Sequence, residues 1–231
     1  MDNAPVLTID GPSGSGKGTV SRAAARALGW ALLDSGALYR LVALAGRQAG
    51  VPLDNGPELA RLAQQLDLRF ASGRSGEGLV WLSGTEVTGA IRTEEAGNDA
   101  SKVAAIPQVR AALLERQRRF AVPPGLVADG RDMGTVVFPG AEVKIFLTAS
   151  AAERALRRYK QLKEKGVAAN LAALSLEIAE RDRRDMSRAS SPLVASADAT
   201  MLDTTGMSVD AVVERVLKVA RGRLSPGVLK K

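Results

Sequence analysis

The sequence predicts an α/β fold in which helices cover both faces of a parallel central sheet. Short apolar segments of strand length alternate along most of the chain with longer segments that carry apolar residues at helical spacing. This alternation is typical of parallel sheets. Three apolar segments end in polar residues, namely Asp10-Gly11, Asp34-Ser35-Gly36 and Asp129-Gly130-Arg131-Asp132. Because such sheets bind ligands beyond the carboxyl ends of their strands, these residues predict where the site lies.

The first strand begins at Val6, and a helix is expected over Lys17–Leu28. Between them, Gly11, Gly16 and Lys17 fit the spacing G-x-x-x-x-G-K. Glycines let backbone N–H groups face an anion closely, and the helix start adds more N–H groups and a positive dipole end. A lysine at this position supplies a full charge to the outer phosphates. The segment predicts a bound nucleoside triphosphate; the alternative is a turn that only joins a strand to a helix.

One residue of this loop departs from the common pattern. The usual Ser or Thr after the lysine is replaced by Gly18, and the hydroxyl group comes one residue later, at Thr19. This shift argues against the GTPase form of the loop and leaves open whether a protein hydroxyl binds Mg²⁺ directly. The chain has no Cys and no His. A metal ion must therefore sit on oxygen ligands, which favours Mg²⁺, and a proton acceptor must be a carboxylate, Lys or Tyr.

The region after the first helix predicts another strand and two helices. Trp30–Leu33 is short and apolar, as expected for a buried strand, and Ser35 is suited to cap a helix over about Ala37–Gly50. A link marked by proline and glycine then precedes a short helix over about Glu58–Gln65.

A small antiparallel sheet is expected next. Leu66–Phe70 alternates apolar and polar residues, which is the period of a strand. Leu79–Leu82 and a short piece at Glu86-Val87 predict two further strands, with a turn at 72–78 between the first two. A helix is expected from about Ile91 to Ala104. The hairpin-type segment interrupts the alternation of strands and helices.

The rest of the chain returns to that alternation. Pro107 suits the first position of a helix that runs to about Phe120. The predicted strands are Leu126–Ala128, Val143–Leu147 and Met201-Leu202. The remaining helices are one capped by Ser150 that runs to about Lys165, one capped by Asn170 that runs to about Arg188, and a final one capped by Ser208.

The helix after Asn170 carries a stripe that changes from apolar to charged. Its members follow steps of three and four, which keeps them on one helix face: Leu171, Leu174, Ile178, Arg181, Asp185 and Arg188. Charged residues thus continue a core-facing surface, where unpaired charges are costly. A phosphate and a sugar hydroxyl would satisfy them. The alternative is a solvated helix end at which Asp185 pairs with a neighbouring arginine.

Two further groups of charged residues are candidates for the site. Arg131 and Asp132 follow a buried strand; they serve either simple turn chemistry or recognition of a phosphate and a base amino group. Asp129 is placed to orient Mg²⁺-bound water in the manner of a Walker-B acid. Arg154, Arg157 and Arg158 crowd one helix start. For most of these arginines we expect a solvated face, with one or two closing as a lid over the triphosphate.

Composition limits the class of protein. At 231 residues, the chain fits one domain or one domain with insertions. The net charge of +7 favours either a polyanion such as RNA or a cleft that gathers phosphates, and an aromatic content of 3% argues against base-stacking platforms. No apolar run approaches the roughly 18 residues of a membrane span, and no signal peptide is evident. We expect a cytoplasmic monomer without membrane or nucleic-acid partners.

Four segments together resemble the bacterial cytidylate kinase family of nucleoside monophosphate kinases. They are Gly11–Thr19, Asp34–Arg40, Asp129–Thr135 and Arg181–Asp185. The loop alone would indicate only a P-loop protein, whereas four motifs in this order are specific, and the similarity extends from the first strand to the last helix. The hydroxyl at Thr19 is normal for such kinases.

The resemblance implies transfer of a phosphoryl group from ATP to CMP or dCMP, giving CDP or dCDP, with Mg²⁺. It implies one P-loop kinase domain over 1–231 with a three-layer α/β/α core. A monophosphate-binding insertion at about 37–104 would contain the small antiparallel sheet. A short helical lid and its flanking helices would occupy about 151–188.

The resemblance also implies a role for each site residue. ATP would be bound by Gly11, Pro12, Ser13, Gly14, Ser15, Gly16, Lys17, Gly18, Thr19 and Arg157. The CMP phosphate would be gripped by Arg40, Arg131 and Arg188, of which Arg131 and Arg188 would join Lys17 in catalysis. Cytosine would be read by Ser101, Arg110 and Asp132, the sugar held by Arg181 and Asp185, and the acceptor pocket lined by Ser35 and Tyr39. Mg²⁺ would be held mainly by phosphates and water, with Thr19 and Asp129 as candidate ligands.

The implied reaction suits a chain without His or Cys, because phosphoryl transfer depends on positioning and charge neutralisation and a phosphate acceptor is already ionised. Three alternatives stay open. A GTPase is one, since Asp203–Gly206 matches D-x-x-G, although this match comes late and no N-K-x-D follows. The others are a basic RNA-binding module and a kinase of another small metabolite, in which Asp129 or Asp132 would serve as the base.

Overall fold

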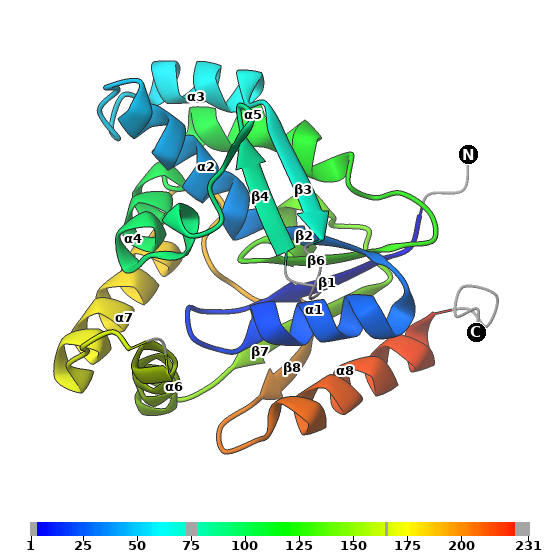
Figure 1. Cartoon of the computed structure of the whole chain (residues 1–231). Coiled ribbons are helices and arrows are strands. Elements are labelled where there is room, and N and C mark those ends of the chain that lie inside the picture. Colours follow the sequence, from blue (N-terminus) through cyan, green and yellow to red (C-terminus); the bar gives the residue numbers. More distant parts are fainter. Residues whose placement is uncertain (1–3, 73–77, 165, 225–231) are drawn as a thin grey trace. The chain divides into compact units, whose positions relative to one another are not determined.

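The computed structural model describes residues 4–72, 78–164 and 166–224 of the chain (Figure 1). These residues form two compact units. The sheet unit comprises Met1–Asp34 and Gln117–Lys231, and the inserted unit comprises Ser35–Arg116. In the part of the chain that the structure describes, no helix is both long enough and apolar enough to cross a membrane.

The sheet unit is built on a parallel sheet of five strands in the order β2-β6-β1-β7-β8. The strands are β1 (Val6–Asp10), β2 (Ala31–Asp34), β6 (Leu126–Gly130), β7 (Val143–Thr148) and β8 (Thr200–Asp203). Every neighbouring pair is parallel, which confirms the predicted α/β fold. All residues of β1 and β6 are buried, and their apolar runs are typical of strands covered on both faces.

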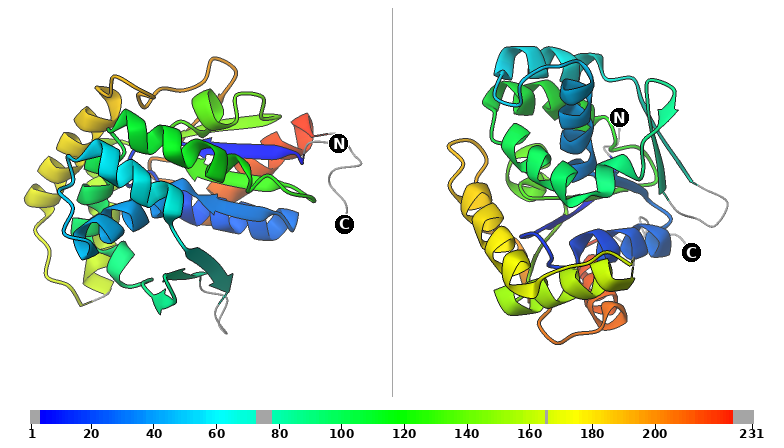
Figure 2. Two further views of the ribbon diagram at one scale, coloured as in Figure 1. Left: turned by 90° about the horizontal axis from the view of Figure 1, so that it is seen from above. Right: turned by 60° about the vertical axis from the view of Figure 1, so that its left-hand side comes forward.

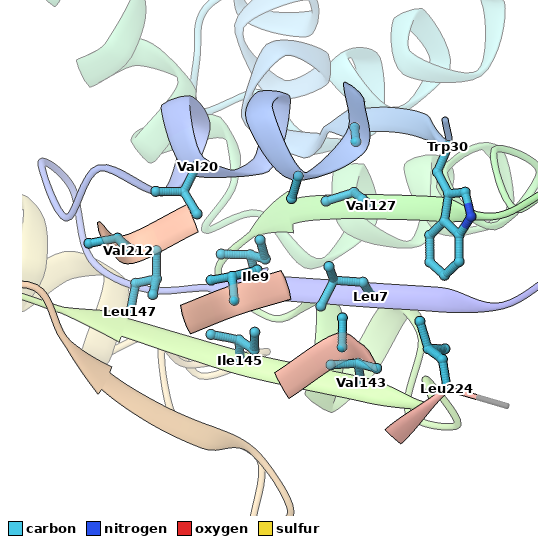
Figure 3. Close-up of a cluster of buried hydrophobic side chains, with 14 residues drawn as sticks. Leu7, Ile9, Val20, Trp30, Val127, Val143, Ile145, Leu147, Val212 and Leu224 are labelled. Carbon is cyan, nitrogen blue, oxygen red and sulfur yellow. The ribbon is translucent and has the colours of Figure 1, made fainter. Parts of the chain in front are cut away.

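Two helices pack against one face of this sheet, namely α1 (Lys17–Leu28) and α8 (Val209–Arg223). Figure 3 shows their side chains in one cluster with those of the central strands: Val20 from α1 lies near Ile9, and Val212 from α8 lies near Leu147. The cluster is formed almost wholly by aliphatic side chains with less than 10% exposure. This core fixes the sheet from which the loop after β1 emerges.

The other two helices of the unit, α6 (Ala151–Glu164) and α7 (Leu171–Met186), lie side by side (Figure 2). Three predicted caps are confirmed. The Ser150 hydroxyl accepts the Glu153 N–H at 3.2 Å, and the Asn170 and Ser208 side chains accept the N–H groups three residues further on, at 3.1 and 3.2 Å.

The inserted unit combines helices with a small antiparallel sheet of three strands in the order β3-β4-β5. Its strands are β3 (Leu68–Ser72), β4 (Gly78–Leu82) and β5 (Thr85–Glu86), as the alternating pattern predicts. The turn expected at 72–78 falls largely on 73–77, outside the described residues. The helices are α2 (Ser35–Gln48), α3 (Gly56–Gln65), η1 (Ala90–Arg92), α4 (Glu94–Val103) and α5 (Pro107–Arg118), whose last two residues belong to the sheet unit.

Two predicted boundaries in this unit are wrong. Ser35 does not precede its helix but is the first residue of α2, which starts directly after β2. The single helix expected over Ile91–Ala104 is broken at Thr93. The Thr93 hydroxyl accepts the Ala96 N–H at 3.1 Å and so caps α4, which leaves Ile91 in the short 3₁₀ turn η1.

Candidate functional site

The polar ends of three strands lie at neighbouring positions of the sheet. Asp34 at the end of β2 is opposite Asp129 of β6, and Asp10 at the end of β1 is opposite Gly130. The three polar segments that the sequence singles out therefore lie at the carboxyl ends of three adjacent strands. The glycine-rich loop and the segment that contains Arg131 both begin at these carboxyl ends.

The glycine-rich loop has little room for side chains. A Cβ at Gly11 would lie 2.2 Å from the carbonyl oxygen of Leu147, and one at Gly14 would lie 3.0 Å from the Arg154 Cβ. Gly14 and Gly16 have φ of +75° and +89°, values that favour glycine. No side chain caps α1, which begins directly after Gly16. The loop is thus a backbone-lined cradle at a helix start, as phosphate binding requires.

Lys17 is buried at the base of this loop, and its Nζ donates to the Pro12 carbonyl at 3.0 Å. The pKa of Lys17 is lowered to about 7, mainly by burial and then by the charges of Arg131 and Arg181, while Asp129 and Asp185 oppose the shift. The ammonium group therefore lies in a region of excess positive charge. A bound anion would relieve that excess and favour the charged form of the lysine.

Asp129 packs closely against Gly18. A Cβ at Gly18 would lie 3.2 Å from Asp129 Oδ2, so that the carboxylate packs against the backbone where other loops carry a hydroxyl-bearing side chain. Burial raises the pKa of Asp129 to about 6, although Lys17 draws it down. Thr19, which carries the displaced hydroxyl, is exposed. Within the described ranges no group of three or more His, Cys, Asp or Glu side chains is arranged to hold a metal ion.

Asp185 joins two arginines of the sheet unit. Its Oδ2 accepts from Arg131 Nε at 2.8 Å, and its Oδ1 accepts from Arg188 Nη2. Burial opposes ionisation, but Arg131 and Arg188 hold the pKa of Asp185 below its usual value. The predicted stripe is buried at Leu174, Ile178 and Asp185, whereas Leu171 is exposed. α7 ends at Met186, so Arg188 follows the helix; its side chain is 5% exposed and that of Asp185 2%. The alternative of a solvated helix end is wrong, although the pairing that it proposed between Asp185 and a neighbouring arginine is present.

The segment after β6 is not the simple loop that the sequence predicts. Met133–Val137 forms a short π-helical turn, η2, directly after Arg131 and Asp132. Asp132 is buried, and Asp10 accepts backbone N–H groups from the first two residues of the turn. The sequence offers no local signal for η2, because the carboxylate that caps it comes from a distant strand.

Arg154 corrects the expectation of a solvated basic face. It is buried, forms an ion pair with Asp182 of α7 at 2.6 Å, and donates to the carbonyl groups of Ser13 and Ala149 at 2.9 and 3.1 Å. The arginine therefore connects α6, α7, the end of β7 and the glycine-rich loop. Sequence reasoning missed Asp182 as a partner, although it follows Ile178 by four residues and so shares its helix face.

Arg157 also touches the loop backbone. Its Nη1 donates to the Ser15 carbonyl at 3.3 Å and to Thr204 Oγ1 at 3.0 Å, while its Nε pairs with Glu153 at 2.8 Å. Arg158 instead donates to Gln161 on its own helix. Of the three arginines at the start of α6, two are therefore held against the loop that begins the site.

The inserted unit carries the other site residues that the resemblance implies. Ser35, Tyr39 and Ser101 are buried, and Arg40 is half-buried. The Arg110 guanidinium lies over the Tyr39 ring, 5.6 Å from its centroid, and donates to the Ala104 carbonyl at 3.2 Å. An ion pair of 2.6 Å between Arg47 and the buried Asp99 connects α2 to α4, the helices of Tyr39 and Ser101.

Comparison with known proteins shows which family the chain belongs to. The family model described as Cytidylate kinase matches residues 7–222. A cytidylate kinase of Shewanella loihica is 55% identical over 226 residues, which cover 98% of both chains. One of Stutzerimonas stutzeri is 58% identical over 95% of this chain and 96% of its own, and one of Marinomonas sp. is 57% identical over 94% and 95%.

The ion pair between Arg154 and Asp182 generates a prediction about stability. Arg154→Met leaves the Asp182 carboxylate buried and unpaired, and we expect it to lower the unfolding free energy by about 3–5 kcal/mol in urea titrations. Arg154→Met combined with Asp182→Leu removes both charges and should lower the unfolding free energy less than Arg154→Met alone. Arg183→Met on the same helix breaks only an exposed pair with Glu180 and should cost less than about 1 kcal/mol. If Arg154→Met lowers the unfolding free energy as little as Arg183→Met does, the connecting role of Arg154 would be contradicted.

Proposed function

Since the chain belongs to the cytidylate kinase family, we propose that it transfers the γ-phosphoryl group of ATP to CMP or dCMP. The products are ADP and CDP or dCDP. The observation that carries the proposal is the placement of two cationic groups in one unit: Lys17 in its backbone cradle, and Arg131 and Arg188 joined by Asp185. The charges of Arg131 and Arg181 act on Lys17 directly. Such a site suits two phosphate groups that must approach each other.

The cradle is the ATP side of this site. The backbone of Gly11–Gly16 and the start of α1 would bind the phosphates, and Lys17 would place its charge on the outer ones. Arg157, whose Nη1 lies against the Ser15 carbonyl, is close enough to this loop to share in binding. We also propose that α6 and α7, within 151–188, act as the lid that excludes water during transfer.

The resemblance assigns the remaining residues to the acceptor nucleotide. Arg131 and Arg188, with Arg40 of the inserted unit, would grip the CMP phosphate through bidentate contacts. Asp132, Ser101 and Arg110 would read cytosine. Arg181 and Asp185 would hold the sugar, and Ser35 and Tyr39 would line the pocket. Both Asp185 oxygens already accept an arginine N–H, so the carboxylate is held in place at this site.

The chemistry requires charge neutralisation rather than a strong base. Lys17, Arg131 and Arg188 would offset charge on the phosphoryl group and its two partners, because the acceptor phosphate is already ionised at neutral pH. Mg²⁺ would neutralise phosphate oxygens of ATP. The donor set fits an ion bound mainly by phosphates and water, with Asp129 to orient that water and the exposed Thr19 hydroxyl, two residues after Lys17, as a second candidate. We expect the enzyme to work as a cytoplasmic monomer, without nucleic-acid partners.

A panel of acceptors tests the proposed function. We expect phosphorylation of CMP and dCMP in an ADP-release assay to exceed that of UMP, AMP, GMP and dTMP. Lys17→Met should lower kcat by about 100-fold or more, because it removes a fixed positive charge that would stabilise the transition state. The circular dichroism spectrum should stay that of the wild type. Equal rates with all acceptors would contradict the assignment of cytosine recognition. Strong, salt-sensitive RNA binding without turnover of mononucleotides would favour the RNA-binding alternative.

The lowered pKa of Lys17 generates a second prediction. At pH 8 the lysine of the free enzyme is mostly neutral, because its pKa is about 7. Phosphates raise this pKa, so that ATP binding takes up a proton, approaching about one per site. The binding enthalpy at pH 8 should therefore rise with the ionisation enthalpy of the buffer. Lys17→Arg, which is always charged, should abolish that dependence. A dependence as strong in Lys17→Arg as in the wild type would contradict the prediction.

A further inference from the structure

Asp10 is a buried carboxylate with no part in the proposed mechanism. It is the last residue of β1 and only 5% exposed, and the glycine-rich loop follows it directly. Its Oδ1 accepts the Met133 N–H at 2.9 Å and its Oδ2 accepts the Gly134 N–H at 2.8 Å. These are the opening N–H groups of η2, which a helical turn cannot pair internally. Asp10 therefore caps η2 from a strand 123 residues away in sequence.

Asp132 occupies the position from which such a turn is usually capped. An Asp there ordinarily accepts N–H groups of its own turn, yet the Asp132 side chain makes no capping hydrogen bond to η2. Asp10 satisfies those donors in its place. The Asp132 carboxylate, which is proposed to read cytosine, is therefore not needed as the cap of η2.

Close packing fixes the same segment against β1. A Cβ at Gly134 would lie 2.9 Å from Thr8 Oγ1, and one at Gly130 would lie 2.7 Å from Met133 Cγ. The backbone thus packs closely on both sides of Arg131 and Asp132, at Gly130 against the Met133 side chain and at Gly134 against β1. Arg131 is held a second time, by its ion pair with Asp185.

Burying the ionised Asp10 carboxylate at this position lowers the stability of the fold. Burial raises the pKa of Asp10 to about 7, and the nearby charges of Asp132 and Asp129 add to the effect, while the hydrogen bonds from Gly134 and Met133 oppose it. An apolar side chain would fill the same space without that cost. What the carboxylate contributes is the pair of bonds to η2.

We propose that Asp10 is a positioning residue that sets Arg131 and Asp132 for the acceptor nucleotide. It acts through these two residues and touches neither substrate. The inference rests on the proposed function, because it requires that Arg131 contacts the CMP phosphate and Asp132 the cytosine.

Asp10→Asn tests this role. Asn keeps one acceptor oxygen but turns an NH₂ group toward the second backbone N–H, so that one of the two bonds to η2 is lost. We expect kcat/KM for CMP to fall about tenfold and the ratio of kcat/KM for CMP to that for UMP to fall about fivefold, as expected for a lost buried hydrogen bond. The KM for ATP should stay within about twofold, because the cradle is built by other residues. Asp10→Ser, which also keeps one acceptor, should give the same pattern.

Thr8→Val is the matched control. Thr8 is buried on the same strand beside the same turn, and its hydroxyl has no hydrogen-bond partner among the described residues. We expect its kinetic constants to equal those of the wild type.

The CMP-to-UMP ratio separates positioning from folding, since it does not depend on how much protein is folded. An unchanged ratio and an unchanged KM for CMP in Asp10→Asn, with only a lower Tm or kcat, would overturn the inference while the proposed function stands. A wild-type enzyme without a preference for CMP would instead overturn the proposed function and the inference with it.

Discussion

The buried ammonium group of Lys17 is the feature on which the rest of the site depends. It is enclosed by protein, it lies near the positive charges of Arg131 and Arg181, and its pKa is lowered to about 7. A fold does not gain stability from such an arrangement by itself. Under the proposed function, bound phosphates would supply the missing negative charge, and the energetic cost of the buried lysine in the free protein would favour highly charged ligands. The net charge of +7 is consistent with a cleft that gathers phosphates.

Three side chains hold this site in place, and two of them, Arg154 and Asp10, have no part in its proposed contacts. Arg154 connects the glycine-rich loop to α7, which carries Asp185. Asp10 caps the turn after Arg131, and Asp129 packs against Gly18. Each acts between segments that are distant in sequence. Preorganisation of this kind is what phosphoryl transfer asks of a protein, because the reaction gains more from fixed charges than from reactive side chains.

The sequence predicts the local features of this structure well. Alternating apolar segments indicate the five-stranded sheet, and Ser150, Asn170 and Ser208 cap their helices as expected because capping involves only the next three residues. The features that the sequence does not predict depend on residues that are distant in the chain. The turn η2 forms with a cap supplied by Asp10, and Arg154 is buried because Asp182 and two carbonyl groups surround it. The roles of individual site residues come from resemblance to a family, and composition or spacing alone would not assign cytosine.

The most direct test of the central claim uses one ligand that occupies both anion sites. Adenosine and cytidine joined through their 5′ oxygens by five phosphates would reach from the cradle of Lys17 to Arg131 and Arg188. We expect calorimetry to give a Kd at least about 100-fold below those of ATP and CMP measured separately. Once one half of the ligand is bound, the phosphate linker holds the other half at a high effective concentration near its own site. The same ligand binding no more tightly than ATP would show that the two cationic groups do not form one site.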